Sequence, residues 1–142
     1  YCKKVFSFDI REDHQKIAKK NAEVLGVKNI EFVIGDIYDK EFVNSIIKGV
    51  KASLLTLDIP EPWRAIETAK SALKTGGFIA TYTPTIIQNA DFVNGLKNHS
   101  EFIHLKTINL MEQQWEIDGR RIRPKNWSIY HSGFISFARK VK

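Results

Sequence analysis

Three aspartates follow short apolar runs of the kind that form buried β-strands. Asp9 and Asp58 come directly after such runs, and Asp36 is separated from its run by Gly35. A carboxylate there can accept hydrogen bonds from the hydroxyls of a ribose or from the amine of a base. Each aspartate could instead cap the helix that follows it, because aspartate is a favoured N-cap residue. Three aspartates at equivalent positions favour a site for a nucleoside-containing ligand.

The segment 58–63 places two prolines and an indole behind one of these carboxylates. Pro60 and Pro62 restrict the connection, because a proline ring fixes its own φ angle. The carboxylate of Asp58 and the indole of Trp63 then suit a flat polar ring, through hydrogen bonding and stacking. The alternative is a rigid turn between a strand and a helix, in which Trp63 packs into the core.

Tyr82 and Gln88 flank the end of the next apolar run. In open α/β sheets, ligands bind beyond the carboxyl ends of the strands. We therefore expect both side chains to line the same pocket as Asp58, although a tyrosine at a strand end is often only an edge-of-core residue.

Basic residues gather in one short segment. The chain has 22 lysines and arginines against 16 aspartates and glutamates, which gives a formal net charge of +6. Residues 120–125 contain four of these cations: Arg120, Arg121, Arg123 and Lys125. Such a cluster attracts polyanions, of which nucleic acid is the commonest inside cells. The alternative is a solubilising surface that binds nothing anionic.

The elements that must position these residues alternate between short apolar runs and segments with helical spacing. This alternation predicts an α/β sheet that is mostly parallel, and two long β-type segments near the end predict antiparallel strands at one edge. The run 52–57 is almost continuously apolar, which is typical of a strand buried on both faces. The predicted strands are 5–9, 30–34, 52–57, 78–83, 102–117 and 127–139, with helices at 12–25, 41–48, 62–75 and 86–97 and a basic loop at 118–126.

Length and composition indicate one globular domain. The 142 residues are 43% apolar and 27% charged, which excludes a disordered chain. Cys2 is the only cysteine, so no internal disulfide or cysteine-based zinc cluster can form, and the four histidines lack metal-ligand spacing. No apolar run approaches the ~20 residues that cross a bilayer, and no signal-peptide pattern is present. We therefore predict a cytoplasmic protein without a metal site or membrane contact.

In order along the chain, these segments resemble the tRNA (adenine-N1)-methyltransferase family of class I S-adenosylmethionine-dependent methyltransferases. The resemblance spans nearly the whole chain. The stretch around Asp58 and the stretch of Tyr82, Pro84 and Gln88 are specific to this family. A glycine–aspartate pair after a strand is shared by most class I methyltransferases. The matching stretches are Ser7-Phe8-Asp9-Ile10-Arg11-Glu12-Asp13, Gly35-Asp36-Ile37, Leu57-Asp58-Ile59-Pro60-Glu61-Pro62-Trp63, Tyr82-Thr83-Pro84 with Gln88, Arg123-Pro124, and His131-Ser132-Gly133-Phe134-Ile135.

The resemblance implies a Rossmann-like sheet and methyl transfer from S-adenosylmethionine to N1 of a T-loop adenine in tRNA. It also implies a homo-oligomer, usually a tetramer in the family. Asp9 matches the residue that holds the ribose hydroxyls of the cofactor, Asp36 with Ile37 matches the site of its adenine amine, and Asp58 matches the active-site aspartate. The implied base pocket contains Pro60, Trp63, Tyr82 and Gln88, and the implied phosphate contacts are Arg120, Arg121, Arg123 and Lys125.

The resemblance further implies that part of the family's domain is absent. None of the eight glycines forms the G-x-G pattern of the family's cofactor-binding loop, and the match begins at the family's second strand. Residues 1–142 are therefore expected to be a single partial catalytic domain, which lacks the first strand and binds S-adenosylmethionine weakly or not at all. Strands 5–9 and 52–57 would then pair directly, or the gap would be filled by strand exchange with a partner.

The residues are also compatible with two other functions. One is a non-catalytic tRNA-binding or assembly subunit, and the other is a class I methyltransferase that acts on a small molecule such as a corrinoid precursor. Retention of Asp58, Pro60, Trp63, Tyr82 and Gln88 argues against the first function. The basic segment and the 58–63 segment favour RNA over a small molecule.

Overall fold

The computed structural model describes residues 2–129 and 132–142. His131, which belongs to one of the matching stretches, lies outside the described residues. Within the described ranges, no helix is long and apolar enough to cross a membrane. The elements are β1 (Val5–Asp9), α1 (Glu12–Val24), β2 (Ile30–Ile34), α2 (Lys40–Ile47), β3 (Ala52–Asp58), the 3-10 helix η1 (Pro62–Ala65), α3 (Ile66–Ala72), β4 (Leu73–Thr83), α4 (Ile86–Lys97), β5 (Phe102–Ile108), β6 (Glu112–Asp118), β7 (Arg121–Ile129) and β8 (Phe134–Lys140).

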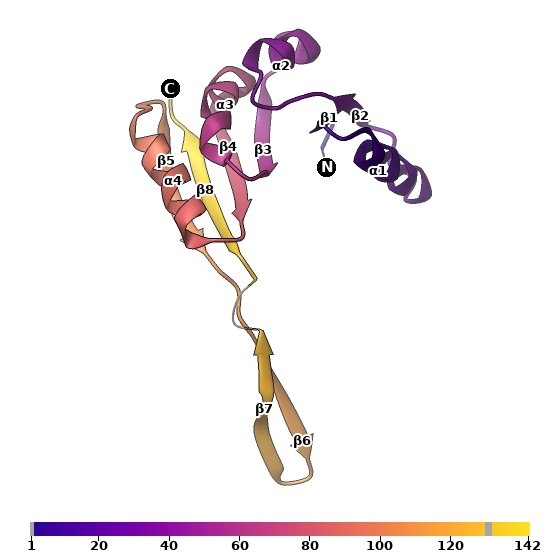
Figure 1. Ribbon diagram of the computed structural model, residues 1–142, viewed down its shortest axis with the longest axis vertical. Coiled ribbons are helices and arrows are strands. Elements are labelled where there is room, and N and C mark those ends of the chain that lie inside the picture. The colour runs from indigo at the N-terminus through magenta and orange to yellow at the C-terminus, as the bar shows by residue number, and fades with distance from the viewer. Residues whose placement is uncertain (1, 130–131) are drawn as a thin grey trace.

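The strands form three separate sheets (Figure 1). The largest has the order β3-β4-β8-β5, in which β3 and β4 are parallel and β8 is antiparallel to both of its neighbours. β1 and β2 form a parallel pair, and β6 and β7 form an antiparallel hairpin. The prediction of an α/β fold with parallel strands followed by antiparallel terminal strands is confirmed.

The terminal hairpin differs from the prediction. Each of the two long strands predicted at 102–117 and 127–139 is divided, so β5 and β8 belong to the main sheet whereas β6 and β7 form an arm that projects from it (Figure 1). The basic segment is not a loop, because the chain reverses in a tight turn at Gly119, which has a φ of 57°. Pro124 lies within β7, which is possible because a two-stranded ribbon leaves every strand with a free edge.

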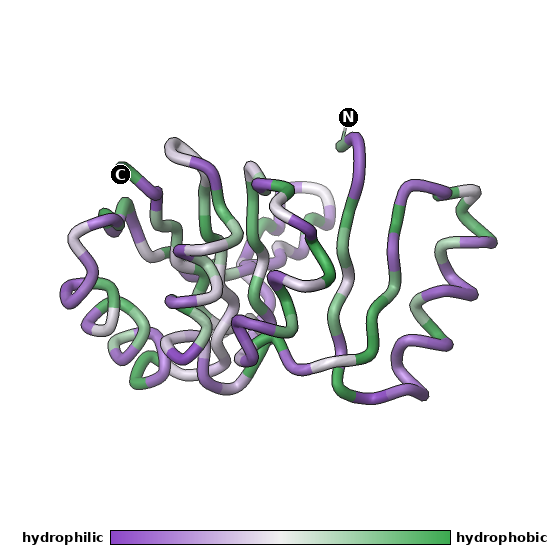
Figure 2. The backbone as a smooth tube through the Cα atoms, turned by 90° about the horizontal axis from the view of Figure 1, so that it is seen from above, coloured by the Kyte–Doolittle hydropathy of each residue, from purple (hydrophilic) through white to green (hydrophobic). Residues whose placement is uncertain are grey.

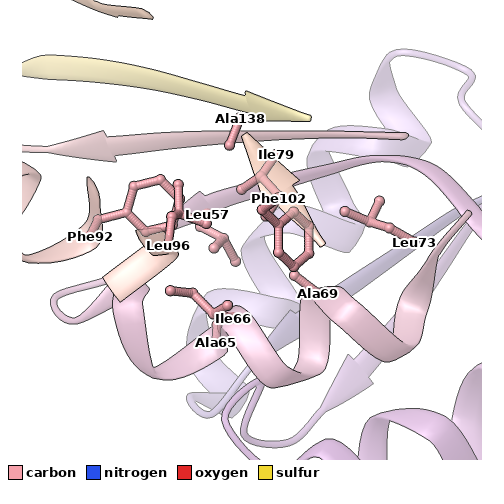
Figure 3. Close-up of a cluster of buried hydrophobic side chains, with 10 residues drawn as sticks. All are labelled: Leu57, Ala65, Ile66, Ala69, Leu73, Ile79, Phe92, Leu96, Phe102 and Ala138. Atoms are coloured by element: carbon pink, nitrogen blue, oxygen red, sulfur yellow. The ribbon is translucent and has the colours of Figure 1, made fainter. Parts of the chain in front are cut away.

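The main core lies between the four-stranded sheet and the helices η1, α3 and α4 (Figure 3). Strand residues alternate between its two faces, so Ile79 is fully buried while Phe78 and Tyr82 are 40% and 39% exposed. The buried residues of this core are Leu57, Ala65, Ile66, Ala69, Leu73, Ile79, Phe92, Leu96, Phe102 and Ala138.

β3 is not buried on both faces, and this prediction is wrong. Leu57 is buried, but Leu54 is 56% exposed and Thr56 is also exposed. The reason is that helices cover the face of β3 to which Leu57 points, and the alternate residues project from the opposite face. A continuous apolar run therefore reflects a strand with one open apolar face.

β1 and β3 face each other without pairing. β1 bonds to β2 and β3 bonds to β4, and a cavity of about 450 Å³ lies between the two unpaired edges. Figure 2 shows β1, which begins near the chain's N-terminus, set apart from the main sheet. Direct pairing of these two strands, one of the two arrangements expected from the sequence, therefore does not occur. Strand exchange with a partner stays a prediction.

Candidate active site

The carboxylates of Asp9 and Asp36 each close a tight turn at one end of the β1–β2 sheet. Asp9 Oδ1 accepts the N–H of Arg11 at 2.8 Å, and Asp36 Oδ1 accepts the N–H of Tyr38 at 2.8 Å. The N–H of Gly35 donates to the carbonyl oxygen of Asp9 at 3.0 Å, so the two turns adjoin. In each aspartate, Oδ1 accepts the hydrogen bond of its own turn, and Oδ2 is the oxygen that a ligand could reach.

His14 stands beside the second oxygen of Asp9. Its Nδ1 lies 3.5 Å from Asp9 Oδ2 and 2.6 Å from Arg11 Nη2. A guanidinium group can only donate, so Nδ1 is the acceptor in the contact with Arg11. An Nδ1 that accepts from Arg11 does not donate to Asp9, which leaves Oδ2 for the hydroxyl groups of a ligand.

None of the three aspartates caps the helix that follows it. The N-cap residues are Arg11 for α1, Asp39 for α2 and Glu61 for η1, and only Asp39 makes a side-chain cap. The alternative that these carboxylates serve as helix caps is therefore wrong.

Asp58 and Tyr82 lie side by side at the ends of β3 and β4. They are register partners in the parallel ladder, so their side chains project from the same face of the sheet. Both residues line the cavity between β1 and β3, and Asp58 is exposed. In the described part of the chain, no protein donor bonds to the Asp58 carboxylate. This carboxylate is thus an acceptor at the cavity wall, with a tyrosine ring as its neighbour.

Gln88 holds the segment that follows Asp58. Its Nε2 donates to the carbonyl oxygen of Pro60 at 3.0 Å, and its Oε1 accepts from Thr85 Oγ1 at 2.7 Å. Thr85 is also the N-cap of α4 and accepts the N–H of Gln88 at 3.3 Å. Both polar ends of the Gln88 side chain are therefore engaged, and its contribution to the pocket is to fix the Pro60 backbone against α4.

Trp63 is half-buried and packs against the main core. Its Cβ lies close to α4, where a Cβ built on Gly95 would be 3.3 Å from it. This position corresponds to the alternative in which Trp63 packs into the core. A contact between Trp63 and a target base stays a prediction.

Tyr38 is a site residue that the sequence did not single out. Its phenol oxygen accepts the N–H of Glu61 at 3.2 Å, and the Arg64 guanidinium lies 4.3 Å from its ring centroid. Burial raises the pKa of Tyr38, with the N–H of Glu61 acting in the opposite direction, so the phenol is neutral near pH 7. The only available signal was its spacing two residues after Asp36.

The four basic residues lie on the β6–β7 arm, Arg120 in its turn and the other three on β7, and the arm projects away from β3 (Figure 1). Arg123 is ion-paired with Glu116, whose Oε2 lies 2.8 Å from both its Nε and its Nη2. Lys125 Nζ lies 3.3 Å from Gln114 Oε1. The arm therefore forms a separate cationic surface, of which Arg123 is partly neutralised.

The structure thus gathers nine of the candidate residues into three places, whereas Pro60, Trp63 and Gln88 are not among the residues that line the cavity. Asp58, Tyr82 and Ile37 line the cavity, the turns of Asp9 and Asp36 adjoin at the end of β1–β2, and the basic residues lie on the arm. The carbonyl of Ile37 accepts Thr68 Oγ1 at 3.0 Å, which fixes its backbone to α3. Across residues 2–129 and 132–142, no three histidine, cysteine, aspartate or glutamate side chains converge as metal ligands.

Comparison with known proteins identifies sequence relatives over nearly the whole chain. A tRNA (adenine(57)-N(1)/adenine(58)-N(1))-methyltransferase from Methanocaldococcus jannaschii is 33% identical, over 96% of this chain and 55% of its own length. A tRNA (adenine(58)-N(1))-methyltransferase from Thermus thermophilus is 28% identical, over 97% of this chain and 52% of its own length. The chain therefore spans about half the length of these curated relatives.

Solved structures agree with the fold. An S-adenosylmethionine-dependent O-methyltransferase from Thermotoga maritima superposes with a TM-score of 0.85 at 28% identity, covering 98% of this chain and 50% of the other. A tRNA methyltransferase from Aquifex aeolicus superposes with a TM-score of 0.79 at 24% identity, covering 98% of this chain and 54% of the other. These neighbours confirm the Rossmann-like class I methyltransferase fold.

The family match extends from β1 into β8. The family described as the tRNA methyltransferase complex GCD14 subunit matches residues 2–136, which include all three aspartates and the arm. The predicted family resemblance is confirmed, and this chain belongs to the tRNA methyltransferase complex GCD14 subunit family.

Proposed function

We propose that this chain carries the catalytic aspartate of an S-adenosylmethionine-dependent methyltransferase that modifies N1 of an adenine in tRNA. The observation that carries the proposal is the exposed carboxylate of Asp58, which lines a cavity beside Tyr82 in a chain of this family. Relatives described as tRNA (adenine-N1)-methyltransferases support the choice of substrate. Residues 1–142 then correspond to one partial catalytic domain.

The residues at the end of β1–β2 fit S-adenosylmethionine, which supplies a methyl group carried on a sulfonium. Ribose hydroxyls and the adenine amine are hydrogen-bond donors, and carboxylate oxygens are suitable acceptors for them. Asp9 Oδ2 is available for the hydroxyls, and Asp36 has a second oxygen for the amine. Ile37, in the cavity wall, supplies apolar surface.

In the proposed mechanism, Asp58 orients the target base and does not act as a strong base. Adenine N1 already has a lone pair, so no proton has to be removed to create the nucleophile. The Asp58 carboxylate accepts from the N6 amine of an extruded adenine, fixes the angle of the ring and stabilises the positive charge that develops on it. Tyr82 and Trp63 border the base, and Gln88 acts through the Pro60 backbone.

The arm supplies the proposed contact with RNA. Arg120, Arg121, Arg123 and Lys125 would contact phosphates, which gives affinity without sequence preference. An isolated two-stranded ribbon is marginally stable in water, so the arm is expected to be covered by RNA or by a second copy of the chain. We therefore include a homo-oligomer in the proposal. A cytoplasmic location is also proposed, because the proposed substrate is tRNA.

The proposal is tested by Asp58→Asn and Asp58→Ala in the polypeptide that methylates tRNA, whether this chain or a longer one that contains it. The assay measures methyl incorporation into a tRNA transcript. Loss of one preorganised group at a developing charge is expected to reduce kcat by about 10²–10³. Asp91→Asn, at an exposed position of α4, is the matched control and should retain full activity. Undiminished methylation by Asp58→Ala would refute the proposal.

A modified substrate isolates the contact with the N6 amine. In a tRNA whose target adenine is replaced by purine, the amine is absent while N1 remains. The penalty of Asp58→Asn should then shrink, because the bond that it removes no longer exists. An equal penalty on both substrates would assign Asp58 a different role.

The cofactor proposal has its own measurement. Calorimetry on the 142-residue chain is expected to find weak or undetectable binding of S-adenosylmethionine, because these residues include no G-x-G loop. Micromolar binding would refute the expectation that a G-x-G loop is needed for the affinity. Asp9→Ala and Asp36→Ala should each abolish whatever binding is measured.

A further inference from the structure

A hydrogen bond joins the two chain segments at the root of the β6–β7 arm, where residue 110 enters the arm and residue 132 leaves it. Ser132 Oγ donates to the carbonyl oxygen of Leu110 at 2.9 Å. Leu110 precedes β6 and Ser132 precedes β8, so this single bond joins the two ends of the segment that contains the whole arm. The position of Ser132 is therefore tied to the direction in which the arm leaves the sheet.

Tyr82 is fixed to the same root. Its hydroxyl donates to the carbonyl oxygen of Ser132 at 2.7 Å. Gly133 has a φ of +103°, and a Cβ built on it would lie 2.5 Å from Tyr82 Cε2 and 2.6 Å from Cζ and Oη. The Tyr82 ring thus occupies the space that any side chain at position 133 would need, and the ring and the glycine require each other.

Tyr82 in turn stands next to the candidate catalytic carboxylate. It is the register partner of Asp58, and both residues line the cavity between β1 and β3. A continuous set of contacts therefore leads from the arm root, through Ser132 and Gly133, to the Tyr82 ring beside Asp58.

We propose that Gly133 and the carbonyl of Ser132 are positioning residues that hold the Tyr82 ring beside Asp58 and so couple the arm to the base pocket. This inference rests on the proposed function. Movement of the arm root displaces Ser132 and Gly133, and the Tyr82 ring must follow because its hydroxyl and its edge are both held there. Binding of RNA by the arm is thereby linked to the shape of the pocket.

The contact is tested first by thermal unfolding, which needs no activity. Gly133→Ala is compared with Gly49→Ala, since Gly49 also has a positive φ of +79° but nothing within 4 Å of its Cβ position. Both variants carry backbone strain, whereas only Gly133→Ala meets the Tyr82 ring. Gly133→Ala should therefore lower Tm more than Gly49→Ala, and Tyr82→Ala in the same chain should remove most of the difference.

Comparing Gly133→Ala in the chain with Tyr82 and in the chain with Tyr82→Ala gives a decisive outcome even if one variant does not fold. If Gly133→Ala fails to fold, recovery of folding by Gly133→Ala with Tyr82→Ala supports the contact. An equal loss of Tm in the two backgrounds, or a failure to fold in both, overturns it.

Kinetics on the methylating polypeptide test the positioning role. A displacement of about 1 Å in an active site can cost up to about 10²-fold, so Gly133→Ala should reduce kcat by at least about tenfold. KM for tRNA should stay unchanged, because the cationic arm is intact. Gly49→Ala should leave kcat unchanged despite its loss of stability. Equal kcat values for Gly133→Ala and Gly49→Ala would refute the positioning role of Gly133. Full activity of Asp58→Ala would instead refute the proposed function, and it would not affect the Tm comparison.

Discussion

A buried hydrogen-bond network joins α4 to the antiparallel part of the main sheet, and Ser136→Ala tests its strength. Asn89 Nδ2 donates to Ser136 Oγ at 2.7 Å, and Thr107 Oγ1 lies 2.6 Å from the same oxygen. Ser136 is fully buried and Asn89 is 3% exposed. Thr107 Oγ1 also donates to Asn89 Oδ1 at 3.2 Å, so the three residues form a closed set.

The loss of stability expected for Ser136→Ala follows from the hydrogen bonds that each residue of the network loses. Ser136→Ala removes the only acceptor of Asn89 Nδ2 in the network, whereas Thr107 keeps its contacts with Asn89 Oδ1 and His104 Nε2. One buried amide donor is therefore left unsatisfied, which costs about 1–3 kcal/mol. For a chain of this size, each kcal/mol lowers Tm by about 2–4 °C, so a loss of about 4–8 °C is expected for a cost of about 2 kcal/mol.

Thermal unfolding, monitored by circular dichroism, measures this decrease in Tm. Ser53→Ala, at an exposed position of β3, is the matched control and should change stability by less than about 0.5 kcal/mol. Ser136→Ala combined with Asn89→Leu removes both partners and should recover part of the loss, because no unsatisfied donor remains. If Ser136→Ala behaves like the control, Asn89 Nδ2 finds another acceptor and the reasoning is refuted.

Three further predictions concern the open edge of β1, an ion pair and the arm. The N–H of Val5 points to β2, and the direction of the N–H groups alternates along a strand, so the N–H groups of Phe6 and Phe8 face the cavity. These two amides should therefore exchange with deuterium faster than the amide of Val5. Equal protection of the three amides would mean that a strand fills the gap in solution. A hydrogen bond from Lys70 lowers the pKa of Glu101 from its ordinary value of about 4.5. This pair therefore stabilises the fold fully above that pH, and its contribution is lost as pH falls through the lower folded pKa. Glu101→Gln should therefore flatten the acid limb of a Tm-versus-pH curve, and an unchanged limb would contradict the shift. Arg120→Ala should reduce the slope of log binding constant for tRNA against log salt by about 0.7–0.9, and an unaltered slope would exclude a phosphate contact there.

Several elements were predictable because their signals are local. The helix predicted at 86–97 coincides with α4, since Thr85 caps its first turn through the N–H of Gln88. Pro62 begins η1, which is the start of the helix predicted at 62–75. The family was also recognisable, because the stretch around Asp58 and the stretch of Tyr82, Pro84 and Gln88 combine residue types that seldom occur together by chance.

Other features could not be predicted because they depend on contacts between distant parts of the chain. The apolar run of β3 does not reveal that Leu54 lies on a face without helices. The basic segment reads as a loop until the pairing of β6 with β7 is known, and the ion pair of Arg123 with Glu116 then reduces its free charge. Trp63 suits either a stacking platform or a core position, and its packing against the main core cannot be seen in the sequence.

The amino-acid sequence by itself determined the chemical content of this protein: the aspartates after the strands, the proline-bounded segment that follows Asp58, the basic cluster and the class of fold. These follow from residue types and short spacings, which are properties of neighbours along the chain. Only the tertiary structure decided that Tyr82 is held by Ser132, 50 residues away, and that Asp58 faces a cavity between unpaired edges. The physical reason is that these contacts depend on the order of strands in space, and residues far apart in the sequence meet only when the sheets have formed.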